Sequence, residues 1–148
     1  MNHRIQILYG TESGNAQYCA ETLGDRLVKL KIDHEVTDMG RYDPAQIVHE
    51  QFIVVVTSTH GNGDAPANAE RTLDYLRDNQ VDLSNTKFAV CGLGDSSFFY
   101  FAQCGKDFDE ILGQRGAHRA LERVDCDVDY DEDFDQFSDQ LIALLTMH

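Results

Sequence analysis

Runs of hydrophobic residues alternate along this chain with segments in which hydrophobic residues recur every three or four positions. Three short runs, at 5–9, 52–56 and 87–91, are rich in β-branched or aromatic residues and predict strands. The second run is hydrophobic throughout, which is typical of a central strand covered by helices on both faces. Weaker patterns predict one further strand within 32–39 and a last strand within 117–128.

The intervening segments have the period of amphipathic helices, each with one hydrophobic face that would pack on a sheet. Four such helices are predicted, and Gly113 and Gly116 would end the third. The four hydrophobic faces comprise, in chain order, Ala16, Cys19, Ala20, Leu23, Leu27 and Leu30; Ala69, Leu73 and Leu76; Phe101, Cys104, Phe108, Ile111 and Leu112; and Phe134, Phe137, Leu141, Leu144 and Leu145.

This alternation predicts the α/β class, with a doubly wound, five-stranded parallel sheet and helices on both of its faces. A chain of 148 residues is long enough to bury one core, and no repeat or linker interrupts the pattern. We therefore expect a single domain over residues 1–148.

The charge balance narrows the choice of partners. The chain has 12 Lys and Arg against 26 Asp and Glu, a net charge of −14. This excess repels nucleic acid and anionic membranes and predicts protein partners with a basic face. The N-terminus lacks the long apolar region of a signal peptide and no run approaches the length of a membrane span, so a cytoplasmic protein is expected.

The four cysteines stand far apart in the sequence, without a Cys-x-x-Cys pair. This spacing argues against a zinc site and against a dithiol redox motif, and it favours small buried thiols.

Three unusual loops leave the ends of predicted strands, at residues 10–15, 58–68 and 92–100. Ligands of open α/β sheets bind beyond the carboxyl ends of the strands. If the three strands are neighbours, a spacing of roughly 4.8 Å per strand spreads the loops over about 10 Å. That distance suits one flat heteroaromatic ligand with a phosphate tail.

The first loop reads TESGNA over residues 11–16, at the start of a helix. Backbone N–H groups at a helix start can hold a phosphate without any cationic side chain, and Thr11, Ser13 and Asn15 add side-chain donors. The loop lacks the lysine of a nucleoside-triphosphate loop and the Gly-x-Gly-x-x-Gly of a dinucleotide site. No aspartate ends the central strand, as a receiver domain would require. These exclusions leave a ligand that has one terminal phosphate and requires no metal.

The loops resemble those of a known family. TESGNA at 11–16, STHGNGD at 58–64, and GLGDSSF at 92–98 followed by CGKDFD at 104–109 are similar to the three FMN-binding loops of the flavodoxin superfamily. The third loop and LERVDCDVDY at 121–130 are most similar to the FMN domains of sulfite reductase flavoprotein and cytochrome P450 reductase. The resemblance implies FMN as cofactor and a flavodoxin-like three-layer sandwich with strand order 2-1-3-4-5.

The resemblance also assigns roles to residues. His60 and Phe98 would flank the flavin ring, with Phe98 standing where a tyrosine is usual, and Gly61 would turn its peptide toward the ring. No catalytic residue and no metal ligand is implied. The expected cofactor-binding set is Thr11, Glu12, Ser13, Gly14, Asn15 and Ala16 for the phosphate, and Ser58, Thr59, His60, Gly61, Asn62, Gly63, Leu93, Gly94, Asp95, Phe98, Phe101 and Asp127 around the ring.

The acidic run from 122 to 139 holds nine acids and one arginine. Its Asp125-x-Asp127-x-Asp129 spacing is similar to a calcium loop, but the glycine and the final glutamate of that loop are missing. A solvated acidic face or a docking surface beside the flavin is the better interpretation. Asp64, Asp95 and Asp127 are expected to lower the reduction potential of the flavin.

The sequence thus predicts a monomeric FMN electron carrier that accepts electrons from an NAD(P)H-dependent flavin reductase and passes them singly to a haem or metal enzyme. The chain begins at the first predicted strand and ends with the last helix, which favours a free-standing carrier. An isolated FMN domain of a sulfite-reductase-type diflavin reductase would share this pattern. An FMN-dependent quinone or nitro reductase, or a flavin-free regulatory module, are the further alternatives.

Overall fold

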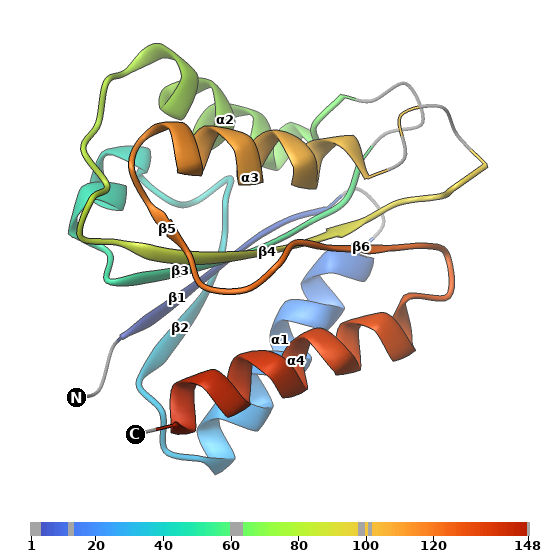
Figure 1. Cartoon of the computed structure of the whole chain (residues 1–148). Helices are drawn as coiled ribbons and strands as arrows, with labels where there is room; N and C mark the ends of the chain where they lie inside the picture. The colour runs from blue at the N-terminus through green and yellow to red at the C-terminus, as the bar shows by residue number, and fades with distance from the viewer. Residues whose placement is uncertain (1–3, 12–13, 60–63, 98–99, 101, 148) are drawn as a thin grey trace.

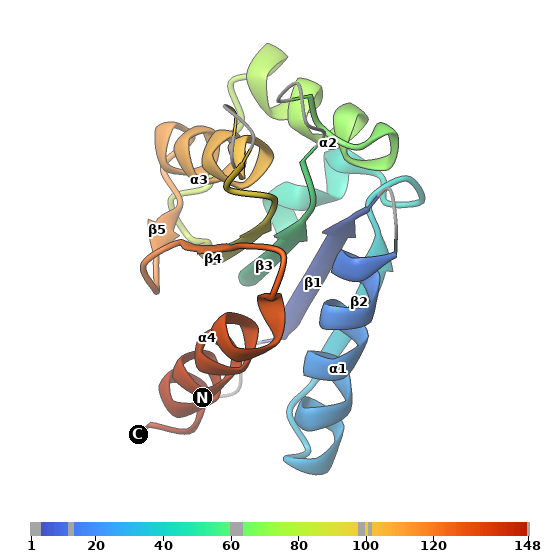
Figure 2. The same ribbon diagram turned by 90° about the vertical axis from the view of Figure 1, so that its right-hand side faces the viewer.

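The computed structural model describes residues 4–11, 14–59, 64–97, 100 and 102–147. A parallel sheet lies between two layers of helices, with α1 and α4 on one face and α2 and α3 on the other (Figures 1 and 2). The elements, in chain order, are β1 (Ile5–Gly10), α1 (Asn15–Lys29), β2 (His34–Asp38), the 3-10 helix η1 (Pro44–His49), β3 (Phe52–Thr57), α2 (Ala67–Asp78), β4 (Lys87–Leu93), α3 (Gln103–Gln114), β5 (His118–Arg119), β6 (Val124–Cys126) and α4 (Tyr130–Thr146).

The strand order is β2-β1-β3-β4-β5, with β6 also paired to β4, and every pairing is parallel. The predicted three-layer fold and strand order are confirmed. β3 is buried along its whole length between β1 and β4, as its hydrophobic run indicated. Side chains of β3 alternate between the two cores because successive residues point to opposite faces.

The predicted last strand is divided into two pieces. β5 pairs with the start of β4 and β6 pairs with its end. Ala120, just after β5, still donates a backbone bond to Phe88 O at 2.8 Å. Ion pairs also hold this part of the chain, since Asp109 on α3 accepts hydrogen bonds from Arg119 at 2.9 and 3.0 Å and from Arg123 at 3.1 Å. The Arg119 guanidinium also lies 5.5 Å from the ring centroid of Phe88.

Three details differ from the sequence prediction. Leu30 was expected on the buried face of the first helix, but α1 ends at Lys29 and Leu30 is 46% exposed. Gly113 lies inside α3, and Gly116, with φ of 94°, follows the end of the helix. η1 was not predicted; it begins at Pro44.

The four cysteines are free and buried, which confirms the expectation of buried thiols. Burial raises the pKa of Cys19 and of Cys104 to about 12, so both thiols stay protonated at neutral pH. The Cys91 and Cys126 sulfurs lie 3.4 Å apart beneath the end of β4. Among the described helices, none combines the length and the apolar character needed to cross a bilayer.

Candidate functional site

The carboxyl ends of the central strands are level with one another. Gly10 of β1 pairs with Thr57 of β3, and Thr57 pairs with Gly92 of β4. The three predicted ligand loops therefore leave the sheet side by side, as the strand order required.

A cavity of about 210 Å³ opens at this edge. Its walls come from the start of α1, the segments after β3, β4 and β6, and the first residue of α4. All of its lining residues except two were predicted for the flavin site: the predicted ones are Asn15, Ser58, Thr59, Leu93, Gly94, Asp95 and Asp127, and the additional ones are Val128 and Tyr130.

The loop after β1 leads into α1 through Gly14, whose φ of 94° suits glycine. The Thr11 hydroxyl accepts a hydrogen bond from Gly14 N at 2.8 Å, and Thr11 N donates to Asn68 Oδ1 at 3.0 Å. The first helical bond runs from Tyr18 N to Gly14 O. The amides of residues 15–17 thus precede the helical ladder and are available to an anion at the positive end of the helix dipole.

The loop after β4 is held by carboxylates. Asp127 Oδ1 accepts from Ser96 N at 3.0 Å and from Val128 N at 2.8 Å. Asp95 Oδ1 accepts from Ser97 N at 2.9 Å and from the Ser97 hydroxyl at 2.6 Å. The bonds from Ser96, followed by that from Val128, hold the pKa of Asp127 below its ordinary value, so this carboxylate stays ionised.

One buried polar atom tests whether the cavity fits a ligand. Ser58 lines the cavity, and its hydroxyl oxygen is buried and has no hydrogen-bond partner among the described residues. Its neighbour Thr59 is satisfied, because the Thr59 hydroxyl accepts from Cys104 N at 2.9 Å. An unpaired buried hydroxyl costs about 1–3 kcal/mol unless a ligand or water satisfies it. Together with the amides at the start of α1, this hydroxyl fits a phosphate-bearing ligand with a polar body.

The other predicted residues divide into two groups. Thr11 and Gly14 shape the first loop, and Ala16 is fully buried in the core, so only its backbone amide could face a ligand. The remainder lie outside the described residues: Glu12, Ser13, His60, Gly61, Asn62, Gly63, Phe98 and Phe101.

Sequence reasoning missed three residues here. The Tyr130 hydroxyl donates to Asn15 Oδ1 at 3.4 Å, across the mouth of the cavity. Val128 is 62% exposed at the rim, and Asn68 holds the first loop from the start of α2. The signal for Tyr130 was its position directly after the acidic strand end, at the beginning of the last helix.

The chain is similar in sequence to a reductase component. The sulfite reductase [NADPH] flavoprotein alpha-component of Yersinia enterocolitica is 41% identical over 142 residues, which are 95% of this chain and 24% of that protein. The same component of Escherichia coli K12 is 42% identical over 125 residues, 84% of this chain and 21% of that protein. The chain thus spans about a quarter of the length of the curated relatives it matches.

The similarity to solved flavodoxin structures extends over the whole fold. A flavodoxin of Streptococcus pneumoniae TIGR4 has a TM-score of 0.82 and 26% identity, and covers 95% of this chain and 98% of its own. Oxidised flavodoxin 2 of Bacillus cereus has a TM-score of 0.81 and 28% identity, with coverage of 95% and 97%.

The family model described as Flavodoxin matches residues 7–138, most of the chain. The chain therefore belongs to the flavodoxin family of electron-transfer domains, whose cofactor is FMN, and this membership confirms the cofactor prediction.

Proposed function

We propose that this chain binds FMN in the cavity at the carboxyl ends of the strands and carries single electrons from an NAD(P)H-dependent flavin reductase to a haem or metal redox enzyme. The observation that supports it most directly is the buried hydroxyl of Ser58, which has no described partner, in a residue that lines a cavity reaching the start of α1. FMN supplies the one-electron chemistry when bound. The protein binds and orients the cofactor and sets the charge around it.

Each part of the site has a proposed role. The amides at the start of α1 hold the phosphate, helped by the side chain of Asn15. Ser58 and Thr59 line the cavity beside the ring, while Asp95 and Asp127 hold the neighbouring loop. The proposal retains the residues implied by resemblance alone: Glu12 and Ser13 at the phosphate, and His60, Gly61, Asn62, Gly63, Phe98 and Phe101 around the ring.

Replacement of Ser58 by alanine tests the binding site. Because the hydroxyl makes no bond to a described protein group, S58A is expected to leave the unfolding free energy of the apoprotein unchanged or slightly higher. A lost hydrogen bond to FMN of about 1–1.5 kcal/mol corresponds to an affinity roughly tenfold weaker, measured by titration of FMN fluorescence.

Ser138 offers a matched control. Its hydroxyl is also buried and without a described partner, but it lies on α4 and does not line the cavity. S138A should bind FMN as tightly as the unaltered protein. Equal FMN affinity in S58A and S138A would contradict the assigned role of Ser58, and a protein that takes up no FMN would contradict the proposed function as a whole.

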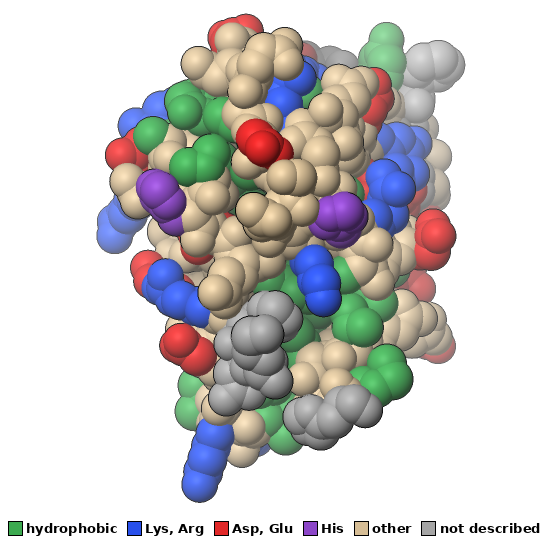
Figure 3. Space-filling model, turned by 60° about the vertical axis from the view of Figure 1, so that its left-hand side comes forward, with side chains coloured by type: hydrophobic (Ala, Val, Ile, Leu, Met, Phe, Trp, Pro, Cys, Tyr) green, Lys and Arg blue, Asp and Glu red, His purple; other side chains and the backbone are tan. Residues whose placement is uncertain are grey.

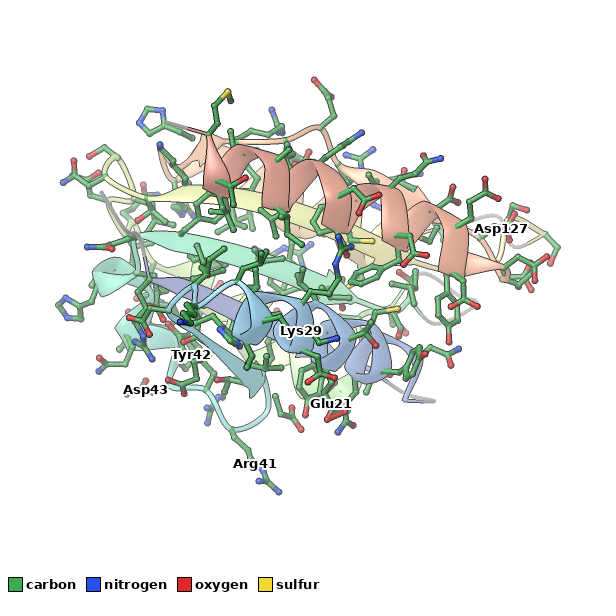
Figure 4. All side chains as sticks on the ribbon, turned by 90° about the horizontal axis from the view of Figure 1, so that it is seen from below. Glu21, Lys29, Arg41, Tyr42, Asp43 and Asp127 are labelled. Atoms are coloured by element: carbon green, nitrogen blue, oxygen red, sulfur yellow. The ribbon has the colours of Figure 1, made fainter. Side chains whose placement is uncertain are left out.

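The distribution of charge supports partners with a basic face. Carboxylates surround the proposed flavin end, including Asp95, Asp127 and Asp129, and Asp127 lies at the extreme end of the molecule (Figure 4). On the face drawn in Figure 3, Lys, Arg and His side chains are interspersed with Asp and Glu. Transfer rates from a basic-faced reductase should fall as salt rises, because screening acts over about 8 Å at physiological ionic strength.

A second candidate is the FMN domain of a sulfite-reductase-type diflavin reductase. The 41% and 42% identities to sulfite reductase flavoproteins, against 26% and 28% to the two solved flavodoxins, favour it. In either setting the purified chain should not oxidise NADPH until a separately purified NADPH-dependent flavin reductase is added. Oxidation of NADPH by the chain alone would instead support a quinone or nitro reductase.

We further propose a monomer acting in the cytoplasm. The four buried cysteines remain free thiols, as is usual in reducing compartments. A single species of one chain's mass in solution, with and without FMN, is the expected result for the oligomeric state.

A further inference from the structure

Asn68, in the first turn of α2, connects the loop after β1 with the end of β2. Its side-chain oxygen accepts from Thr11 N at 3.0 Å, and its side-chain nitrogen donates to Asp38 Oδ1 at 2.9 Å. Asp38 Oδ1 also accepts from Gly40 N at 2.7 Å. Only one orientation of the Asn68 amide satisfies an amide donor on one side and a carboxylate acceptor on the other.

Close packing fixes Asn68 in this position. A Cβ on Gly40 would lie 3.1 Å from the Cβ of Asn68, and a Cβ on Gly10 would lie 2.6 Å from the Cβ of Ala69. The first turn of α2 is therefore seated directly against the ends of β1 and β2, and the side chain of Asn68 has little freedom to move away from the loop.

The order of the groups in this chain of hydrogen bonds has an electrostatic consequence. The group in contact with the loop amide is the neutral carboxamide of Asn68, and the carboxylate of Asp38 stands one side chain further away. A carboxylate in direct contact with Thr11 N would place a negative charge on the loop that must accept the doubly charged phosphate of FMN.

We propose that Asn68 is a positioning residue of the phosphate loop, which anchors Thr11 and keeps the Asp38 carboxylate away from the phosphate. The inference rests on the proposed FMN site, since it concerns the affinity of that site for the phosphate group. It assigns to α2 a function in the first ligand loop, although α2 follows the second ligand loop in the sequence.

The sharpest test exchanges the two side chains. The double variant Asp38→Asn with Asn68→Asp keeps the net charge and an acceptor for Thr11 N, but it moves one negative charge to the loop. Since Asp38 Oδ1 accepts from both Asn68 Nδ2 and Gly40 N, an asparagine at position 38 keeps only one of these two bonds at that atom. The affinity of the double variant for FMN should fall about tenfold. Its affinity for riboflavin, which has no phosphate, should change less than about twofold, because the loss is electrostatic and acts on the phosphate.

Two further variants separate charge from structure. Asn68→Ala removes both hydrogen bonds without adding charge, and should speed hydrogen exchange of the Thr11 amide in the apoprotein. Asn79→Asp adds the same charge at the far end of α2, where Asn79 is exposed, and should leave the ratio of FMN to riboflavin affinity unchanged.

The ratio of the two affinities decides the outcome. A purely structural role for Asn68 would weaken FMN and riboflavin binding together. A ratio in the exchanged variant within twofold of the unaltered protein, or an unaltered exchange rate of the Thr11 amide in Asn68→Ala, would overturn the inference. Absence of FMN binding in the unaltered protein would overturn the proposed function instead, so the two failures are distinguishable.

Discussion

The loops after β1 and β4 hold their backbone amides with different kinds of side chain. In the loop after β1 the acceptors are neutral, the Thr11 hydroxyl for Gly14 N and the Asn68 carboxamide for Thr11 N. In the loop after β4 they are the carboxylates of Asp95 and Asp127.

This difference matches the two ends of the proposed cofactor. A carboxylate at the first loop would oppose the phosphate, whereas a carboxylate at the other loop makes added electrons on the ring less favourable without repelling the phosphate at short range. The two described side-chain acceptors of the loop after β1 are neutral, which favours binding of an anionic phosphate by a chain with a net charge of −14.

The largest effect is expected where α3 packs closely against β4 and supports the loop after β4. A Cβ on Gly105 of α3 would lie 2.9 Å from the backbone Cα of Gly92, so Gly105→Ala must force α3 away from β4. We expect a loss of about 2–3 kcal/mol in the unfolding free energy, measured by urea denaturation of the apoprotein. Gly113→Ala on the same helix meets only the end of Arg119, at 3.9 Å, and should be neutral or stabilise by roughly 0.5 kcal/mol. Equal effects at the two positions would contradict the close approach.

A smaller effect is expected in the loop after β1. Thr11→Val removes the hydroxyl that accepts from Gly14 N, while Thr11→Ser keeps it. The valine variant should lose about 1 kcal/mol of apoprotein stability and bind FMN more weakly, since the turn before α1 loses its internal acceptor. The serine variant should retain most of both properties. If serine weakens the protein more than valine does, the methyl group, and not the hydrogen bond, supports the loop.

Charge alone can be removed from the loop after β4. Asp127 uses one oxygen for both of its backbone bonds, and Asp95 uses one oxygen for both bonds from Ser97, so an asparagine can keep them in each case. Asp127→Asn and Asp95→Asn should each raise the midpoint potentials of bound FMN by roughly 20–50 mV, measured by redox titration. Asp78→Asn, at the far end of α2, is the control and should leave the potentials unchanged. Unmoved potentials in both site variants would exclude an electrostatic role for these carboxylates.

Local pattern predicted the fold and the edge of the sheet at which the cavity lies. The glycines and hydroxyl residues after three hydrophobic runs indicated loops that bind a ligand, and Asn15 of the first loop lines the cavity. Ser58 and Asp127, which also line it, were implied only by the resemblance to the family. The hydrophobic period continues one residue past Lys29, the last residue of α1, to Leu30. Periodicity alone does not show where a helix ends.

Contacts between distant parts of the sequence could not be predicted in this way. Asn68 and Thr11 are 57 positions apart, and Tyr130 and Asn15 are 115 positions apart. The ion pairs of Asp109, which lie where the last strand is divided, also join separate elements. A polar residue in an ordinary helical turn gives no local sign of the loop that it will hold.

The smallest expected effect concerns acid. Hydrogen bonds from Ser96 and Val128 favour the ionised form of Asp127, so its folded pKa lies below the unfolded value of about 3.9. This contribution to stability is present above the unfolded pKa and is lost as the pH falls through the folded pKa. Asp127→Asn keeps the bonds without titrating, so its unfolding free energy should fall less steeply than that of the unaltered protein below about pH 4.

Asp82 offers a comparison outside both loops, because hydrogen bonds from Ser84 lower its pKa in the same way. Asp82→Asn should also reduce the fall of the unfolding free energy below about pH 4, but it should leave the potential of bound FMN unchanged. If the unfolding free energy of Asp127→Asn falls with pH as steeply as that of the unaltered protein, the loop does not hold this carboxylate in its ionised form. The contrast between the two loops would then depend on Asp95 alone.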